Sequence, residues 1–442
     1  MSTRGSPPPP TGRVFYGWFV VAVLCFVSIL DGGFASIFSA FLKPLSGEFG
    51  WTRAQTSGGF SLYMVAAGAV LPFWGWLADR RGARIVFLWS ALIDGVALLL
   101  LSRVRSLGAF YAWYLLLGVG LGGIGPATVG KVVSEWFVAG RGLAMGVALA
   151  GGAAGGFLLV PLAGFVIVAL GWPAAYQALA GVALGGMLPL VWFLLADSPR
   201  KKGLTPLGEG DRPERTGQAI DDPGPALSGC TLREALGKST FWCLGLAFCL
   251  GSVAAFGVTT HQVAFLQDAG LDLEWASTIA GVTLGVTTVG RLLVGWASGR
   301  TDRPHRMLGA CLVVQAVGVA LLLQTHVWGL WTVAAFALLF GLGFGGFVVL
   351  YPLCVGHDFG LRAFGAIAAV LGTIGVTLGG AVGPVVVGLS YDDTGSYFWA
   401  FVLCAGLLLA AAAVAFATRE TVRSRLAAET FVAPARARGT AT

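Results

Sequence analysis

Residues 75–84 read GWLADRRGAR and residues 295–303 read GWASGRTDR, so a Gly-Trp pair followed by a basic stretch recurs 220 positions later. Two further landmarks repeat in the same order at nearly the same spacing. RGLA at 141–144 corresponds to RAFG at 362–365, and the Pro and Gly-aromatic group at 161–176 corresponds to that at 384–397. An internal repeat decides the architecture before any local motif does. The chain is therefore predicted to consist of two halves with the same fold and orientation.

The composition excludes a soluble protein. Of the 442 residues, 56% are apolar and 11% are charged, and 67 glycines add to the non-polar share. A soluble domain has roughly 45–50% apolar and about 25% charged residues. So little polar surface cannot cover a soluble body of this size, and the chain is predicted to be a polytopic membrane protein.

Twelve stretches reach the roughly 20 apolar residues that a helix needs to cross a bilayer core about 30 Å thick. They are 15–41, 55–78, 84–102, 108–137, 142–168, 173–196, 240–266, 275–299, 307–325, 328–353, 362–389 and 396–417. Residues 197–239, rich in Pro, Gly and charge, form a predicted cytoplasmic linker between six-helix bundles at 15–196 and 240–418. A disordered N-terminal tail is predicted at 1–14 and a cytoplasmic tail at 419–442. The predicted fold is an all-α membrane protein with twelve transmembrane helices in two parallel repeats.

The basic residues orient the chain in the membrane. With the N-terminus in the cytoplasm, 22 of the 28 Lys and Arg residues fall in the termini and the even-numbered loops, and four fall in the odd-numbered loops. Cytoplasmic loops carry such an excess of Lys and Arg. The net charge of +7 therefore reflects topology rather than a nucleic-acid partner. We expect a multi-pass protein of the inner or plasma membrane with both termini cytoplasmic.

Neither a cofactor nor a metal site is expected. The seven cysteines include no CxxC pair, and the four histidines (His261, His305, His326 and His357) are scattered along the chain. Metal sites and disulfide frameworks are indicated by characteristic spacings, and an enzyme would need a nucleophile, base or metal constellation. The chain is therefore predicted not to be an enzyme.

The stretch GWLADRRGAR at 75–84 resembles the loop between helices two and three of the major facilitator superfamily, and 295–303 resembles a degenerate second copy. Within that superfamily the chain is similar to the monocarboxylate transporters and the bacterial oxalate/formate-type antiporters. Residues 16–18 resemble the start of their first helix, residues 136–148 their fifth-helix signature, and residues 391–397 the loop before their last helix. The resemblance implies a secondary transporter built from two bundles around a midplane site.

Arg291 is the candidate for binding a substrate carboxylate. An ionisable residue inside a span is costly and usually paired or facing water, and a planar guanidinium can bind a carboxylate through two parallel hydrogen bonds. The resemblance implies this role, because monocarboxylate transporters carry a substrate-binding Arg in helix eight at a similar position. The alternatives are an Arg that snorkels toward the inner surface near Arg300 and a structural ion pair.

Ser36 and Phe347 complete the predicted substrate site. Ser36 stands where the resemblance implies a Lys in many monocarboxylate transporters, which argues against lactate or pyruvate and leaves a larger or differently shaped carboxylate open. Phe347 belongs to a group of aromatic residues that could line a cavity for a small organic acid. The alternative for Phe347 is packing within the helices or contact with lipid.

Asp31 and His261 are the candidates for carrying a coupling proton. Asp31 lies near the middle of the first helix, where a buried carboxylate titrates closer to neutrality. It could instead neutralise Arg291 or donate a hydrogen bond to a backbone carbonyl. His261 titrates in the useful range near the outer end of helix seven, although a lone His at a helix end is often a solvated or capping residue.

Asp79, Arg80 and Arg84 are predicted to form a conformational latch at the cytoplasmic ends of helices two and three. A carboxylate there can pair with an Arg and face a helix N-terminus, and such a latch would break when the halves rock. The alternative is membrane anchoring by the basic residues alone. Lys131 and Glu135, four residues apart in helix four, are predicted to form a structural pair, and the alternative is a gating or substrate role.

The predicted function is secondary active transport of a small organic monocarboxylate together with a proton, in a lipid bilayer and without ATP hydrolysis. The two parallel halves fit two rivals equally well, namely exchange of one organic anion for another and efflux of another small amphipathic compound. Uptake that requires an inward proton gradient would indicate symport. Uptake that requires an exchangeable anion on the inside would indicate exchange. We expect the chain to act as a monomer.

Overall fold

The structure, a computed structural model, describes residues 15–137, 140–207, 229–298, 300, 303–325, 329–360 and 362–418. The predicted tails and most of the predicted linker, residues 208–228, lie outside the described residues. Every regular element in the described ranges is a helix, as the sequence predicts.

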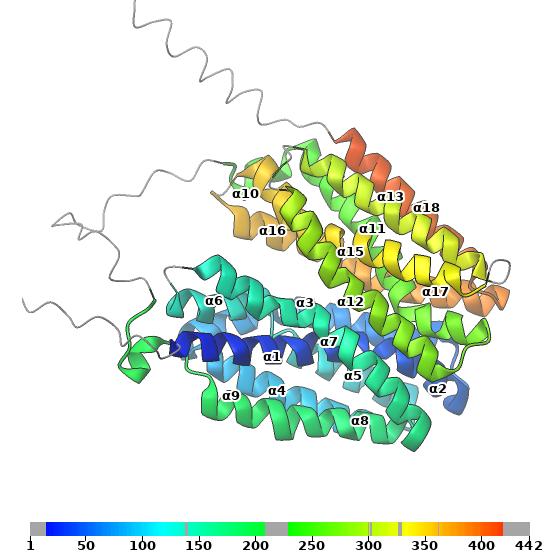
Figure 1. Ribbon diagram of the computed structural model, residues 1–442, viewed down its shortest axis with the longest axis horizontal. Coiled ribbons are helices and arrows are strands. Elements are labelled where there is room, and N and C mark those ends of the chain that lie inside the picture. Colours follow the sequence, from blue (N-terminus) through cyan, green and yellow to red (C-terminus); the bar gives the residue numbers. More distant parts are fainter. Residues whose placement is uncertain are drawn as a thin grey trace, which may run out of the picture.

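The first half of the chain folds into one helical bundle (Figure 1). Its elements are α1 (Tyr16–Ser36), α2 (Phe38–Phe49), α3 (Arg53–Arg81), α4 (Ala83–Leu101), α5 (Leu107–Leu121), α6 (Pro126–Trp136), α7 (Arg141–Leu170), α8 (Trp172–Gly181), a π-helical segment (Val182–Met187) and α9 (Leu188–Leu194). A capping box begins α3, because the Thr52 and Gln55 side chains each accept the other's backbone N–H. Two orphan N–H groups of the first turn are thereby satisfied.

The second half forms a bundle beside the first. A short helix, α10 (Leu232–Leu236), lies within the predicted linker. The helices that follow are α11 (Ser239–Asp268), α12 (Leu273–Ser298), α13 (Pro304–Leu323), α15 (Trp331–Phe359), α16 (Phe364–Gly372), a π-helical segment (Thr373–Leu378), α17 (Gly379–Thr394) and α18 (Phe398–Ala417).

Eleven helices in the described ranges are long and apolar enough to cross a membrane. The remaining predicted span, 108–137, is divided into α5 and α6 by residues 122–125. Gly125 is the N-cap of α6, and Pro126 occupies its first turn, where a missing N–H costs nothing. The sequence therefore predicts the twelve crossings but not this break within the fourth.

The repeat is visible in side-chain contacts as well as in the order of helices. The Arg80 guanidinium lies over the Trp76 ring at 4.7 Å, and the Arg300 guanidinium lies over the Trp296 ring at 3.6 Å. These two cation–π pairs occupy positions 220 residues apart in the two quoted stretches. The same Arg–Trp cation–π pair therefore lies at the end of α3 in one bundle and at the end of α12 in the other.

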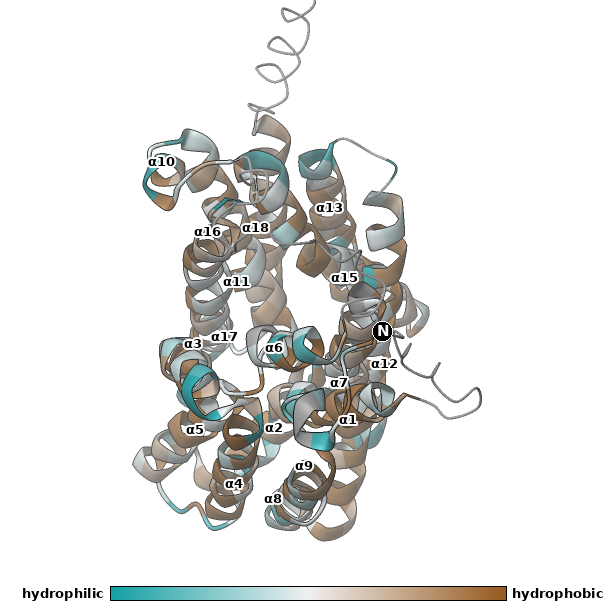
Figure 2. Cartoon of the chain, turned by 90° about the vertical axis from the view of Figure 1, so that its left-hand side faces the viewer, coloured by the Kyte–Doolittle hydropathy of each residue, from teal (hydrophilic) through white to brown (hydrophobic). Residues whose placement is uncertain are grey.

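The helices of both bundles end at two opposite faces of the protein, which we name by the predicted orientation in the membrane. The predicted cytoplasmic face holds the start of α1 and the end of α3, and the predicted outer face holds the ends of α2 and α17 (Figure 1). Figure 2 views the molecule from the predicted cytoplasmic face, with hydrophilic residues at the near ends of helices such as α6 and α13 and hydrophobic residues along the helix bodies.

Glycines let α1 and α7 pack backbone against backbone. A Cβ placed on Gly151 would overlap the carbonyl oxygen of Cys25, and one placed on Gly155 would overlap that of Ile29. Small residues at four-residue spacing allow membrane helices to approach this closely. This contact fixes the position of α1, which carries part of the candidate site.

Gly155→Ala is expected to destabilise the protein, because the methyl group meets backbone that cannot move without separating α1 from α7. Overpacking of this kind costs about 1–3 kcal/mol, so the thermal unfolding temperature in detergent should fall by several degrees. Gly146→Ala is the matched control on the same helix, since a Cβ at Gly146 meets no atom within 4 Å. Equal stability of the two variants would contradict the packing argument.

Candidate functional site

A cavity of about 400 Å³ lies between the two bundles, within the size range of small-molecule sites. Helices α1, α2, α3 and α7 contribute one side, and α11, α12 and α15 contribute the other. The polar lining residues are Ser36, Ser39, Tyr63, Thr259, Thr260, Gln262, Thr287 and Arg291. The apolar lining includes Phe38, Phe60, Phe256, Phe344, Met64, Leu284 and Val348.

Arg291 is the only charged residue among the residues that line this cavity in the described part of the chain. Its guanidinium forms no ion pair or hydrogen bond with any described residue, and its Nε atom is buried without a partner. The structure therefore places Arg291 on the cavity wall rather than in a structural ion pair. A cation held in an apolar site without a partner favours an anionic ligand.

Two hydroxyl groups beside the cavity are available as further donors. Tyr63 on α3 and Thr260 on α11 line the cavity and form no hydrogen bond with described residues. By contrast, the hydroxyls of Ser36 and Thr259 donate to carbonyls of their own helices at 2.7 and 2.9 Å. Neither Tyr63 nor Thr260 stands out in the sequence, because one hydroxyl in an apolar helix carries no distinguishing pattern.

The predicted substrate residues divide into two that reach the cavity and one that does not. Ser36 and Arg291 line the cavity, whereas Phe347 does not. Phe347 is 3% exposed and packs behind the wall, with its ring centroid 5.0 Å from that of Phe248 and 6.3 Å from that of Phe344. The packing alternative thus describes where Phe347 lies, and Phe344 is the aromatic residue on the wall.

Asp31 lies next to the cavity on α1, directly before the lining residue Gly32. No ion pair joins it to Arg291 within the described residues. It interacts electrostatically with Tyr63 and with Asp94 on α4. The neighbours of Asp31 are therefore a hydroxyl and a second carboxyl.

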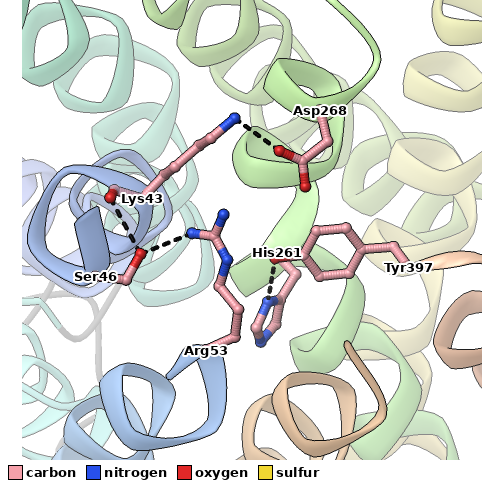
Figure 3. Close-up of polar contacts among 6 residues, drawn as sticks. All are labelled: Lys43, Ser46, Arg53, His261, Asp268 and Tyr397. Atoms are coloured by element: carbon pink, nitrogen blue, oxygen red, sulfur yellow. Dashed lines mark hydrogen bonds and ion pairs between the residues drawn. The ribbon is translucent and has the colours of Figure 1, made fainter. Parts of the chain in front are cut away.

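His261 is completely buried on α11 and links the two bundles. Its Nε2 lies 2.9 Å from the carbonyl oxygen of Pro384 and 3.0 Å from Oγ of Ser57 on α3. Its Nδ1 lies 3.2 Å from the Tyr397 hydroxyl (Figure 3). Because the carbonyl can only accept, Nε2 carries a hydrogen and Nδ1 accepts from Tyr397. Burial raises the pKa of the Tyr397 hydroxyl, which keeps that donor protonated.

Ion pairs and caps join the bundles at the predicted outer face. Lys43 Nζ on α2 lies 2.7 Å from Asp268 Oδ1 on α11 (Figure 3). The Asp392 carboxylate on α17 accepts the backbone N–H groups of Arg53 and Ala54 at 2.8 and 2.9 Å. A carboxylate at a helix N-terminus satisfies orphan donors and interacts favourably with the helix dipole. One bundle therefore caps a helix of the other.

Among described residues, the direct polar contacts between the bundles lie at this face. They are the Lys43–Asp268 pair, the two bonds to Asp392 and the Ser57–His261 contact. Polar contacts thus fasten the bundles together at the predicted outer face.

The predicted latch residues contact other partners rather than one another. Asp79 Oδ1 lies 2.7 Å from Lys131 Nζ on α6, and the backbone N–H of Arg84 donates to Asp197 Oδ1 at 2.6 Å. Arg80 stacks on Trp76. All of these contacts stay within the first bundle and the segment that follows it. The prediction that Lys131 pairs with Glu135 is wrong, because Lys131 forms its ion pair with Asp79.

His305 on α13 forms a mostly buried cluster with the adjacent residues His357 and Asp358 on α15. His305 Nε2 lies 2.9 Å and His357 Nδ1 lies 3.0 Å from Asp358 Oδ1. The side chains of His305 and Asp358 are 2% and 3% exposed. The sequence does not reveal this cluster, because His305 and Asp358 are 53 positions apart. It lies at the predicted cytoplasmic ends of its helices, away from the cavity.

Asp358→Ala is expected to lower the free energy of unfolding by about 3 kcal/mol, because breaking a buried pair strands the remaining polar groups. Asp358→Asn keeps an oxygen that accepts from both imidazoles and should recover most of that loss. The readout is thermal or chemical unfolding of the purified protein. If the alanine variant is as stable as the asparagine variant, the cluster does not hold α13 to α15.

Comparison with known proteins agrees with the fold. Residues 24–376 match the model of the Major Facilitator Superfamily. The chain is 28% identical to the probable sulfoacetate transporter SauU of Cupriavidus necator, over 88% of this chain and 90% of that protein. It is 28% identical to monocarboxylate transporter 11 of Mus musculus, over 92% and 88%.

A solved structure shares the architecture. The bacterial homolog of the human lysosomal transporter Spinster, in its inward-facing and unoccupied conformation, matches with a TM-score of 0.69 at 16% identity, over 92% of this chain and 98% of that one. At this identity the match concerns the fold alone. The family and these relatives are transporters rather than enzymes, as the sequence predicts. The chain therefore belongs to the Major Facilitator Superfamily and is a multi-pass membrane transporter.

Proposed function

We propose that the protein transports a small organic monoanion, bound through its acidic group to Arg291. The observation that carries this proposal is the unpartnered Arg291 guanidinium, which is the only charge among the described lining residues of a mostly apolar cavity. One fixed positive charge matches one negative charge on the substrate. A dianion would leave a second charge without a partner in the site, which is costly.

The surroundings of Arg291 favour an acid with an apolar body and additional acceptor oxygens. Phe60, Phe256 and Phe344 offer apolar surface, and Tyr63 and Thr260 offer hydroxyl donors. A carboxylate or a sulfonate accepts hydrogen bonds from a guanidinium and from hydroxyls at once. The printed name of one relative, a monocarboxylate transporter, supports an organic monoanion as the substrate. The printed name of another, a probable sulfoacetate transporter, supports only the broader class of organic acids, because sulfoacetate carries two acidic groups. Ser36 would contact the same substrate.

Transport is proposed to proceed by alternating access between bundles at 15–196 and 240–418, joined by the linker 197–239. The contacts at the predicted outer face would hold the cavity closed on that side, and their rupture would open it. Asp79, Arg80 and Arg84 would stiffen the opposite end of the first bundle as it rocks. In this proposal the protein acts as a monomer in the inner or plasma membrane, with both termini cytoplasmic.

A proton is proposed to accompany the anion, which makes the transported pair electrically neutral. Asp31, beside the cavity, and His261, between the bundles, are the candidate carriers. Protonation of His261 would add a hydrogen at Nδ1, which would then donate to the Tyr397 oxygen, so the Tyr397 hydroxyl would have to turn its own hydrogen away. Because His261 contacts Ser57 of the other bundle, a charge on His261 would in this proposal act on the closure at the predicted outer face.

The test is uptake of a panel of radiolabelled monocarboxylates and sulfonates into proteoliposomes, with and without an imposed inward proton gradient. We expect one class of acid to be taken up, with stimulation by the gradient, and no uptake of a neutral sugar or an organic cation. Uptake that needs internal anion and ignores the gradient would establish exchange in place of symport. Uptake of the neutral or cationic probe would contradict the proposal.

A further inference from the structure

Asp94 is a completely buried carboxyl group with no hydrogen-bond or ion-pair partner in the described part of the chain. Asp94 lies on α4 and is 0% exposed. Neither of its carboxyl oxygens forms a hydrogen bond or ion pair with a described residue. An ionised carboxylate in such a place would lose its hydration without a compensating cation, at a cost of several kcal/mol. Protonation removes that charge. The placement of Asp94 thus indicates a neutral carboxylic acid.

The packing around Asp94 leaves room for a proton but not for a metal ion. A Cβ placed on Gly120 of α5 would overlap Asp94 Oδ1, so the carboxyl rests directly against the α5 backbone. Ser90, one turn earlier on α4, also has a buried hydroxyl without a partner and faces Gly123. A bound Na⁺ or Ca²⁺ would need several oxygen ligands gathered around it, and Asp94 is not among the cavity-lining residues.

A short series of titratable groups connects Asp94 to the cavity. The groups that interact with it electrostatically are Asp31 on α1 and Tyr63 on α3. Tyr63 lines the cavity, and so does Gly32, the residue after Asp31. Asp31 is half-buried, whereas Asp94 is sealed between α4 and α5. Asp31 is therefore the more accessible of the two carboxyls, and the next residue of its helix, Gly32, lines the cavity.

We propose that Asp94 is a proton-binding site and that Asp94 and Asp31 together hold the coupling proton. In the transfer, the O–H bond of one carboxylic acid breaks as an O–H bond forms on the other, so the pair carries the same total charge before and after. Two carboxyls in one low-dielectric region cannot both ionise at low cost, which makes one shared proton the stable arrangement. The coupling role rests on the proposed proton symport, whereas the protonation of Asp94 does not.

Infrared difference spectroscopy of the purified full-length protein tests the protonation. We expect the C=O stretch of a protonated carboxyl at neutral pH in the wild type, shifted by H/D exchange and lost in Asp94→Asn. Ser90→Ala is the matched control, because it removes the neighbouring unpartnered group and should keep the band. Absence of the band from the wild type, or its persistence at an unchanged frequency in Asp94→Asn, would overturn the assignment whether or not any acid is transported.

Transport in proteoliposomes tests the coupling role separately. Asp94→Asn should retain exchange of labelled for unlabelled substrate within about twofold of the wild type, while stimulation by the proton gradient falls at least tenfold. If the infrared band disappears but gradient-driven uptake stays at the wild-type level, Asp94 is protonated without carrying the coupling proton and that half of the proposal fails. If Asp94→Asn does not fold, Asp31→Asn serves instead, since it should keep the Asp94 band and lose the gradient response.

Discussion

Replacing Arg291 by alanine is expected to abolish concentrative uptake of the substrate acid. The guanidinium is the only charge among the described residues that line the cavity, and it forms no bond with a described residue that a substrate would have to break. Two charge-assisted hydrogen bonds contribute about 1.5–3 kcal/mol each, so their loss should weaken binding at least about 100-fold, with 1.4 kcal/mol corresponding to tenfold. The readout is initial uptake rate against substrate concentration in proteoliposomes.

Two variants separate a loss of binding from a loss of folding. Arg300→Ala removes another arginine at the end of the same helix, where its side chain stacks on Trp296, and it should transport normally. Arg291→Lys keeps the charge but loses the planar fork, so it should bind the acid more weakly than the wild type and more tightly than Arg291→Ala. Normal uptake by Arg291→Ala would remove Arg291 from the substrate site and leave the monoanion proposal without its main support.

Asp392→Ala is expected to open the predicted outer face. The Asp392 carboxylate holds the first turn of α3 through the N–H groups of Arg53 and Ala54, which belong to the other bundle. Hydrogen bonds to a charged group are worth about 1.5–3 kcal/mol each, and partial exposure reduces that value. A net loss of about 2 kcal/mol would shift the balance between closed and open forms roughly 30-fold.

Hydrogen–deuterium exchange followed by mass spectrometry detects this opening. The informative peptides cover residues 277–285 of α12, which face α7 across the bundle interface and do not touch Asp392. Their exchange should accelerate in Asp392→Ala and stay unchanged in Asp393→Ala, the adjacent carboxylate for which no such bond is described. Faster exchange confined to the first turn of α3 would show that Asp392 caps a helix without holding the face closed.

The architecture could be predicted from the sequence because it depends on long, regular signals. Apolar stretches of membrane-crossing length mark the helices, and the stretches at 75–84 and 295–303 mark two copies of one bundle. The cation–π pairs at Arg80 and Arg300 show how alike the copies are. The break between α5 and α6 lay beyond this approach, since a glycine-rich turn inside an apolar stretch does not interrupt its hydrophobicity.

The side-chain pairing could not be predicted to the same degree, because it depends on how helices rotate and meet. Glu135 lies four residues from Lys131 on the same helix, yet Lys131 forms its ion pair with Asp79 of another helix. Lys43 and Asp268 are 225 positions apart and meet only when the bundles close. Phe347 and Phe344 belong to the same apolar helix, and nothing in the sequence tells which of them faces the cavity.

The most direct test of the central claim is an experimental structure determined with the transported acid bound. The account predicts the acidic group within about 2.7–2.9 Å of the Arg291 guanidinium nitrogens, with its body against Phe256 and Phe344 and its other oxygens near Tyr63 and Thr260. An acid found elsewhere in the protein, with Arg291 still unpartnered, would contradict the account.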